Sequence, residues 1–241
     1  MSAIFLIGRR ELSAYLNTGW GYAIMSFVLL LDGLLFNAFA LTDTPRYSAE
    51  VLEDFFYFSS GSTMIAGILL SMKVLAEERS KGTAVLLQTA PIQDHHIIIG
   101  KFLGAFSFLS LITVLTLYMP ILIQLNGKVA WAQIGAGYMG LLLLGGATIA
   151  IGTFASAISR SQLVAAIFGA GILVLGLLGW LLGKITSAPL NEVFSYLAFF
   201  DRHFQPFMRG RVNTESIFYY ASVIGLFLLL SIRILQSRRQ S

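Results

Sequence analysis

The sequence predicts an all-α membrane protein with six transmembrane helices, and three observations support this prediction. Of its 241 residues, 56% are hydrophobic and only 12% are charged, whereas a soluble domain averages about 25% charged residues. The mean hydropathy is +0.78. The apolar residues gather into six blocks, each close to the roughly 20 residues that cross a bilayer as a helix. Because these blocks leave no room for a separate soluble domain, we expect a single membrane domain over residues 1–241.

The first segment, residues 2–18, is predicted to form an amphipathic helix on the membrane surface. Phe5, Leu12 and Leu16 recur at helical spacing, and Arg9 and Arg10 lie between them. A helix with one apolar and one basic face binds at the lipid–water interface. A disordered basic tail is the alternative interpretation of this segment.

The first predicted span covers about residues 20–41 and contains Asp32. Ala38-Phe39-Ala40 has the composition of a signal-peptide cleavage site, but the apolar stretch exceeds the usual ~7–15 residues of a signal peptide. We therefore expect a retained helix. An acid inside a span is a functional candidate because burying it costs a few kcal/mol. The alternative is that Asp32 faces an aqueous cavity, or a hydrogen-bonding neighbour, without a role in transport.

Five further spans are predicted, at about residues 55–76, 101–125, 131–156, 163–183 and 217–235. Two glycine pairs have G-x-x-x-G spacing, Gly100 with Gly104 and Gly179 with Gly183. Small residues at this spacing let helices approach closely in lipid. Since 23 glycines produce such pairs by chance, the pairs are weak indicators of packing.

The basic residues predict that both termini are cytoplasmic, because lysine and arginine accumulate on that side of a membrane. With six spans, the cytoplasmic set is Arg9, Arg10, Lys73, Arg79, Lys81, Lys101, Arg160, Arg233, Arg238 and Arg239. The smaller opposite set is Arg46, Lys128, Lys184, Arg202, Arg209 and Arg211. The net charge of +4 indicates anionic lipid headgroups rather than nucleic acid as the charge partner. The absence of cysteine excludes disulfides and thiolate metal sites.

The polar stretch after the second span has the features of a short helix held between two rigid spans. Gly82 permits a bend, Thr83 is a suitable N-cap, and Pro91 would stop a helix over residues 83–89. Leu86 and Leu87 would give this helix an apolar face. An ordinary polar loop is an equally good interpretation from physical arguments alone.

This stretch resembles the coupling region of ABC-2-type permeases, whose pattern is close to E-R-x-x-G-T-x-E-L-L-x-[ST]-x-P followed by G-K at the third span. The matching residues are Glu78, Arg79, Gly82, Thr83, Leu86, Leu87, Thr89, Pro91, Gly100 and Lys101. The sequence departs from the pattern at Val85, where many members carry glutamate. The resemblance extends over the whole chain. The segment from Tyr196 to Gly210 and the end of the last span resemble the gliding-motility (GldF-like) subgroup.

The resemblance implies a permease in the bacterial cytoplasmic (inner) membrane that exports or extracts an unidentified substrate. Residues 83–89 would be the coupling helix, docked on a dimer of separate ATPase subunits that hold ATP and Mg²⁺. A second permease copy, forming a homodimer, and an accessory membrane protein with an extracytoplasmic domain are further implied partners. The alternatives are ATP-driven remodelling of an envelope partner without transport, and a non-ABC channel or structural subunit.

No catalytic or metal site is predicted in the chain itself. A phosphate-binding loop needs G-x-x-x-x-G-K-[ST], but Gly183-Lys184 is followed by Ile185, and Leu178 holds the position of the first glycine. The energy must therefore come from a partner. Intramembrane proteases with a glutamate pair carry an arginine four residues after the second glutamate. The pair Glu77-Glu78 does not match this spacing, because position 82 is glycine.

Histidines do not indicate a metal either. His95 and His96 have no H-E-x-x-H motif, and the third histidine, His203, is expected on the opposite side of the membrane. Ordinary polar residues at the interface are the preferred interpretation of the histidine pair.

The loop over residues 186–215 mixes aromatic and charged side chains, a composition typical of the lipid–water interface. We expect one or two short helices that rest in or dip into the outer leaflet before the last span. Phe200, Arg202, His203 and Phe204 are candidates for an extracytoplasmic gate. An anchoring belt without a gating role fits the same residues equally well.

Overall fold

The computed structural model describes residues 3–40, 46–82, 92–187 and 190–240. These ranges are helical and contain no strand. The helices in chain order are α1 (Ala3–Leu16), α2 (Gly19–Leu35), the π-helix η1 (Phe36–Ala40), α3 (Ser48–Ser71), α4 (Ala76–Ser80), α6 (Asp94–Leu115), α7 (Tyr118–Asn126), α8 (Trp131–Ile158), α9 (Gln162–Leu177), α10 (Gly179–Ile185), α11 (Leu190–Leu197), α12 (Gln205–Met208) and α13 (Thr214–Gln240).

The prediction of an all-α membrane protein is confirmed. Within the described ranges, five helical stretches are long and apolar enough to cross a membrane, and a sixth is added if α9 and α10 form one bent span. The five are Gly19–Ala38, Ser48–Ser80, Asp94–Leu125, Trp131–Ile158 and Thr214–Arg238. The chain is therefore a multi-pass membrane protein.

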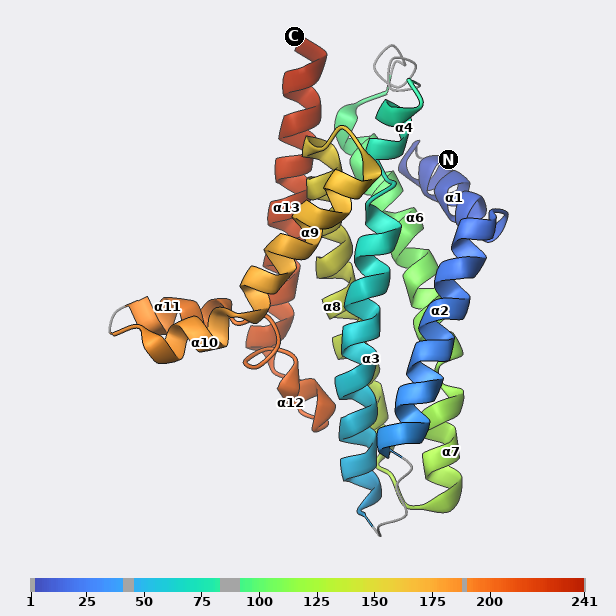
Figure 1. The fold of residues 1–241 in the computed structure, drawn as a ribbon, viewed down its shortest axis with the longest axis vertical. Helices are drawn as coiled ribbons and strands as arrows, with labels where there is room; N and C mark the ends of the chain where they lie inside the picture. The colour runs from blue at the N-terminus through green and yellow to red at the C-terminus, as the bar shows by residue number, and fades with distance from the viewer. Residues whose placement is uncertain (1–2, 41–45, 83–91, 188–189, 241) are drawn as a thin grey trace.

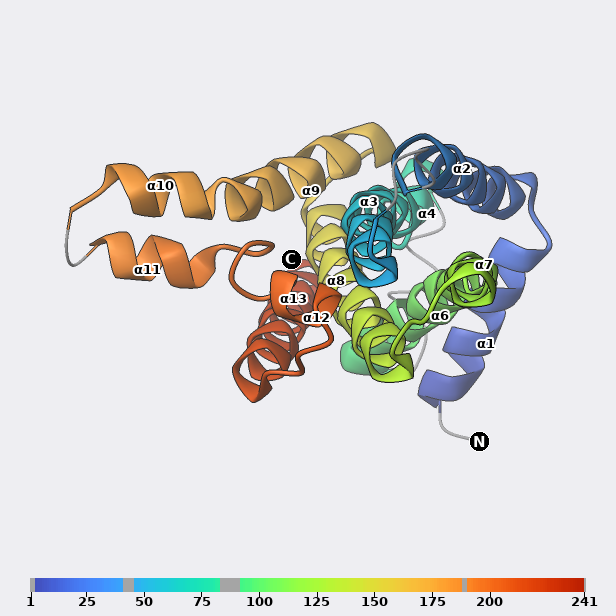
Figure 2. The same cartoon turned by 90° about the horizontal axis from the view of Figure 1, so that it is seen from below.

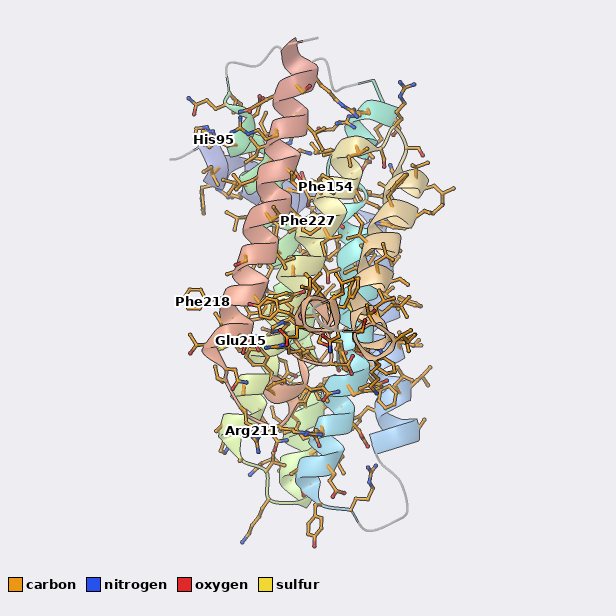
Figure 3. The ribbon with its side chains drawn as sticks, turned by 90° about the vertical axis from the view of Figure 1, so that its left-hand side faces the viewer. His95, Phe154, Arg211, Glu215, Phe218 and Phe227 are labelled. Atoms are coloured by element: carbon orange, nitrogen blue, oxygen red, sulfur yellow. The ribbon has the colours of Figure 1, made fainter. Side chains whose placement is uncertain are left out.

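Helix α8 is the centre of the bundle and packs against α3, α6, α9 and α13 (Figure 2). Its glycines allow this close packing. A side chain at Gly137 would collide with the ring of Phe56 on α3, and one at Gly145 would meet Leu109 on α6 at 2.5 Å. On a third face, Phe154 of α8 and Phe227 of α13 have ring centroids 5.4 Å apart, and Figure 3 shows the two rings together.

The two ends of the bundle differ in what they carry (Figure 1). Both ends of the described chain lie at the end that also carries α4, which we call the terminal end. The opposite end carries α7 and the start of α3, and we call it the distal end. Helix α1 is the predicted amphipathic segment, and it is helical over Ala3–Leu16. It lies beside the terminal part of α6, with which it makes an extensive contact.

Two spans begin earlier than the sequence predicted. Helix α3 starts at Ser48 rather than at about Phe55, and α6 starts at Asp94 rather than at about Lys101. The polar residues in these extra turns have partners that make helix ends stable outside the apolar layer. On α3, Asp54 pairs with Arg46 at 2.7 Å and Glu53 pairs with Arg209 at 2.5 Å.

The predicted span over about residues 163–183 is not one straight helix in the structure. The helix is broken at Leu178, and α10 is bent by 43° from α9. Helices α10 and α11 lie side by side and extend away from the bundle (Figures 1 and 2). Gly179 and Gly183 make this possible, because a side chain at Gly179 would come within 3.0 Å of the Ala198 backbone, and one at Gly183 would collide with Ser195. This glycine pair therefore packs two short helices together instead of two spans.

Two short helices, α11 and α12, precede the last span, as predicted. Their position relative to the outer leaflet stays a prediction.

Candidate coupling site

Lys101 is a buried cation at the point where three segments of the terminal end meet. Its residue is only 5% exposed. The ammonium group donates a hydrogen bond to the carbonyl oxygen of Val74 at 2.6 Å, in the turn between α3 and α4. It lies 2.8 Å from the carboxylate of Glu78 on α4 and 3.7 Å from that of Glu11 on α1. One side chain of α6 thus joins the interfacial helix α1 to the segment that leads into residues 83–91.

The charges at this site do not cancel, because one ammonium group faces two carboxylates. Burial raises the pKa of Glu11 above its usual value of 4.5, the nearby Lys101 lowers it, and the Glu78 carboxylate raises it again. Burial thus opposes the ionisation of Glu11. Movement of α1 or α4 away from Lys101 would leave a carboxylate in apolar surroundings, so the three segments are held together by charge.

Helix α1 approaches α6 closely at the first of the two predicted glycine pairs. A side chain at Gly100 would come within 2.8 Å of Cβ of Ile7, and one at Gly104 would come within 2.5 Å of Cβ of Glu11. The hydroxyl of Tyr15 donates to the carbonyl oxygen of Leu70 at 2.9 Å, which ties α1 to the end of α3 as well. The G-x-x-x-G pair is therefore a close helix contact, with α1 rather than with another span.

Ser156 of α8 fixes the turn between α3 and α4. Its Oγ accepts hydrogen bonds from the backbone N–H groups of Leu75 at 3.0 Å and Ala76 at 2.9 Å, and donates to the carbonyl oxygen of Met72 at 3.0 Å. Backbone groups at helix ends have no partner within the helix. A single buried hydroxyl supplies partners to both helices at this turn.

Three predicted coupling residues lie in the described part of the chain. Glu78 contacts Lys101, and Arg79 donates to the carbonyl oxygen of Ser159 at 2.8 Å, at the end of α8. Gly82 has a φ of +71°, a left-handed conformation that glycine adopts without strain. The other predicted residues, Thr83, Leu86, Leu87, Thr89 and Pro91, lie outside the described residues. The coupling helix itself therefore stays a prediction.

A comparison with protein-family models decides the family. A model described as ABC-2 family transporter protein matches residues 19–234, which is most of the chain. The chain belongs to the ABC-2 family. No curated protein is matched by its sequence.

The ABC-2 family accounts for the general role of the chain. It is a membrane transport protein of the permease type, and an ABC ATPase is the partner of such proteins in general. The buried Lys101 of this ABC-2 chain is the lysine of the G-K pair in the family pattern.

Asp32 lies inside the bundle of the ABC-2 chain and is only 4% exposed. The hydroxyl of Ser62 on α3 lies 2.6 Å from its Oδ1. Asp32 also borders a small cavity between α2, α3, α6 and α8. The hydrogen-bonding neighbour named in the sequence analysis is therefore present, and a cavity lies beside Asp32.

The four residues predicted as an extracytoplasmic gate lie together between α11 and α12. The rings of Phe200 and Phe204 are 5.3 Å apart, and Phe200 also meets Tyr57 of α3 at 5.6 Å. Phe204 is fully buried. Arg202 pairs with Glu215 at 2.9 Å, a residue that Figure 3 places at the distal end of α13.

His203 is fully buried beside α13. Its ring is stacked on Tyr219 with centroids 3.8 Å apart, and its Nε2 lies 2.9 Å from the carbonyl oxygen of Tyr196. Burial lowers its pKa from 6.5, although the hydrogen bond to Tyr196 and the charge of Glu215 act in the opposite direction. The segment is thus packed on the last span through His203 and Tyr219.

The residues that could hold a metal are not brought together in the described ranges, where no three histidine, aspartate or glutamate side chains form a group. His95 and His96 are neighbours on α6, with ring centroids 4.1 Å apart. Figure 3 shows His95 near the terminal end, whereas the segment of His203 packs on the distal part of α13.

Sequence reasoning missed three residues of the coupling site: Glu11, Tyr15 and Ser156. Glu11 had a detectable signal, because it is the one acid in an otherwise basic and apolar helix. Ser156 had none, since serine is common in helices of small residues and only the fold places it against the turn at Leu75.

Proposed function

We propose that this chain is the membrane subunit of an ATP-driven transporter that exports or extracts a substrate, with energy from a separate pair of ATPase subunits. ATP and Mg²⁺ would be held by those subunits. The observation that carries the proposal is the Lys101 site, where the segment leading into residues 83–91 is joined by charge to α1 and α6. A force applied to that segment therefore reaches two helices at once.

The contacts support a mechanical route from the docking segment into the bundle. Helix α4 is short and lies directly before residues 83–91. Its Glu78 contacts α6, its Arg79 contacts the end of α8, and its first N–H group is bound by Ser156. Packed elements of this kind move as units between discrete arrangements. ATP-driven closure of the ATPase pair would push α4 and thereby shift α1, α6 and α8.

The remaining parts of the proposal rest on the sequence. The basic residues favour cytoplasmic termini, which would place the terminal end of the bundle on the side of the ATPase. The bacterial inner membrane, a homodimer of this chain, the gliding-motility-type subgroup and an accessory protein with an extracytoplasmic domain follow from the resemblance alone. Transport of a substrate, rather than remodelling of a partner, is tested directly by flux in proteoliposomes that contain both subunits.

The first experiment tests docking at residues 83–91. Leu86→Asp and Leu87→Asp each place a charge on the proposed apolar face, and we expect the ATPase to be lost when the permease is purified from native membranes. Val85→Glu is the matched control, because the family pattern has glutamate there and the ATPase should still co-purify. If it co-purifies equally with both aspartate variants and its turnover is unchanged, the docking assignment is wrong.

The second experiment separates transmission of force from docking. Glu78→Gln weakens the contact with buried Lys101, so we expect the ATPase to bind but its turnover to become independent of the permease. Glu77→Gln is the control, because Glu77 is the adjacent residue and pairs instead with Lys81, which is largely exposed, at 2.6 Å. Equal behaviour of the two variants would show that the Lys101 site does not transmit the motion.

A further inference from the structure

A small polar cavity lies inside the bundle at Asp32. Its volume is about 10 Å³, which is close to the space that one buried water molecule needs. The polar residues around it are Asp32, Ser59, Thr63, Thr113 and Thr116, and they come from α2, α3 and the end of α6. Apolar side chains, among them Leu141 of α8, complete the wall. A cavity of this size that is bordered by carboxyl and hydroxyl groups has room for a small, hydrogen-bonding ligand.

Among the described residues, no cation is paired with the carboxyl group of Asp32. The described residues around the cavity include no lysine or arginine. An unpaired carboxylate in an apolar interior is so unfavourable that such groups become neutral instead. The two ways to neutralise it are a bound proton and a bound metal cation.

The hydrogen bonds around Ser62 favour the proton. The Oγ of Ser62 lies 2.6 Å from Oδ1 of Asp32 and 3.0 Å from the carbonyl oxygen of Ser59. A hydroxyl has only one proton, so Ser62 cannot donate to both acceptors if Asp32 is ionised. If Asp32 carries a proton, the acid donates to Ser62 and Ser62 donates to the carbonyl, and both short contacts are satisfied.

A second group points to a water molecule. The Oγ of Ser59 is 1% exposed and has no hydrogen-bond partner among the described residues. Buried hydroxyls are rarely left unpaired. Ser59 borders the same cavity as Asp32, so one water there can accept from or donate to Ser59 while it also binds the second oxygen of Asp32.

The cavity also lies where two helices are irregular. The π-helix η1 begins at Phe36, one turn after Asp32, and α6 is interrupted at Thr116 before α7 begins. Single π-helical turns within helices occur frequently at functional sites. The hydroxyl of Thr116 lies 3.0 Å from that of Tyr138 on α8. Polar groups of four helices therefore meet at a place where the backbone can change shape.

We propose that Asp32 and its cavity form a proton-binding site in which the protonated carboxyl group and one water molecule join α2 to α3, α6 and α8. Loss of the proton would create an unpaired charge at the two helix irregularities and draw further water between the helices. The packing of α2 is then linked to protonation. The proposal is independent of the ATPase, because it concerns a ligand of this chain alone.

Few titratable groups face Asp32 from the elements around it. The charge of Asp32 acts on Tyr138 of α8. The Tyr118 hydroxyl of α7 lies near Gly33, the residue that follows Asp32. The acids of α3, Glu53 and Asp54, pair with arginines at its distal end. Lys101 of α6 lies in the coupling site. The group that binds the proton at the cavity is therefore Asp32.

Infrared spectroscopy of the purified chain in lipid nanodiscs tests the proposal. At neutral pH, exposed carboxyl groups are ionised, so a carbonyl stretch of a protonated carboxylic acid reports a buried one. We expect this band in the native chain and in the Asp54→Asn control, and its loss in Asp32→Asn. The asparagine amide can replace the protonated acid as a donor to Ser62, so the variant should fold. Identical spectra of the native chain and Asp32→Asn would overturn the proposal.

Further measurements distinguish the proton from other ligands. If Asp32→Asn does not fold, carbon-13 labelling of aspartate in the native chain must shift the same band, and an unshifted band overturns the assignment. Ser59→Ala should shift the band by changing the water contact, and an unchanged position overturns the water bridge. The melting temperature is also compared in NaCl and in KCl at equal concentration. A higher melting temperature in NaCl for the native chain, with no such difference for Asp32→Asn, would show that a metal cation binds instead of the proton.

Discussion

The ammonium group of Lys101 lies 2.8 Å from the Glu78 carboxylate, and the same group is 3.7 Å from Glu11. The lysine side chain is 7% exposed, and the two carboxylate side chains are 17% and 19% exposed. Ion pairs at this depth are strongly destabilised when one partner is removed, because the other charge stays buried. Helix α1 and the segment before residues 83–91 are therefore both bound by one residue of α6.

Replacing Lys101 by methionine should lower the free energy of unfolding by about 3 kcal/mol, because two partly buried carboxylates lose their cation. The melting temperature of the purified chain in detergent measures this. The double variant Lys101→Met with Glu78→Gln should be more stable than the single variant, since one of the two carboxylates that lost this ammonium group is removed. A single variant that melts with the native chain would show that the carboxylates are already neutral or hydrated.

Replacing Ser156 by alanine should destabilise the turn between α3 and α4. The N–H groups of Leu75 and Ala76 lose their common acceptor, and an unsatisfied buried polar group costs about 1–3 kcal/mol. Ser231→Ala is the matched control, because this buried serine donates only to the carbonyl of Phe227 in its own helix. Amide hydrogen exchange of residues 72–80 should increase in Ser156→Ala and not in Ser231→Ala. Equal exchange in both variants would contradict the assignment.

Replacing Gly104 by alanine should displace α1 from α6. The added methyl group would come within 2.5 Å of Cβ of Glu11 and 2.8 Å of the carbonyl oxygen of Gly8, and overpacking of this kind costs about 1–3 kcal/mol. Gly171→Ala on α9 is the control, since nothing lies within 4 Å of its added atom. Protease cleavage after Arg9 or Arg10 should become faster in Gly104→Ala alone. Unchanged cleavage would mean that α1 is not held by this contact.

The helical class and the approximate spans could be predicted because both follow from apolar block length, which the bilayer imposes directly. The break at Leu178 could not, because apolar residues continue past it to Leu182 without a proline or a charged residue. Gly179 and Gly183 had the correct spacing for close packing, but spacing does not name the partner, which is α11.

The coupling site could be predicted only in part, because the sequence does not name the residues that pack against a local pattern. Glu78, Arg79 and Lys101 belong to a local pattern, whereas Glu11 and Ser156 are distant in sequence and reach the site only through packing. Asp32 was found because an acid in an apolar block is conspicuous. The residues that line its cavity were not, since the side chains of Ser59 and Thr113 become neighbours only when α3 and α6 are placed side by side.

His203 should make the packing of the segment before α13 sensitive to acid. Its ring is buried against Tyr219, with Arg202 and Glu215 as the nearest charged groups, and burial is the main cause that lowers its pKa from 6.5. The unfolded segment therefore binds a proton at a higher pH than the folded one. Stability is fully present above about 6.5, and it decreases as the pH falls toward the lowered pKa of the folded state.

The variant His203→Phe keeps an aromatic ring on Tyr219 but cannot bind a proton, so its stability should depend less on pH. Between about pH 7.5 and about pH 5.5, the melting temperature of the native chain should fall further than that of this variant. At the lower pH, trypsin should cleave the native chain after Arg209 faster than it cleaves the variant. His96→Phe is the control, because its ring lies on α6 beside His95, and it should keep the acid sensitivity of the native chain. If His203→Phe retains the full acid sensitivity, another group is responsible, and the contact with Tyr219 does not couple this segment to pH.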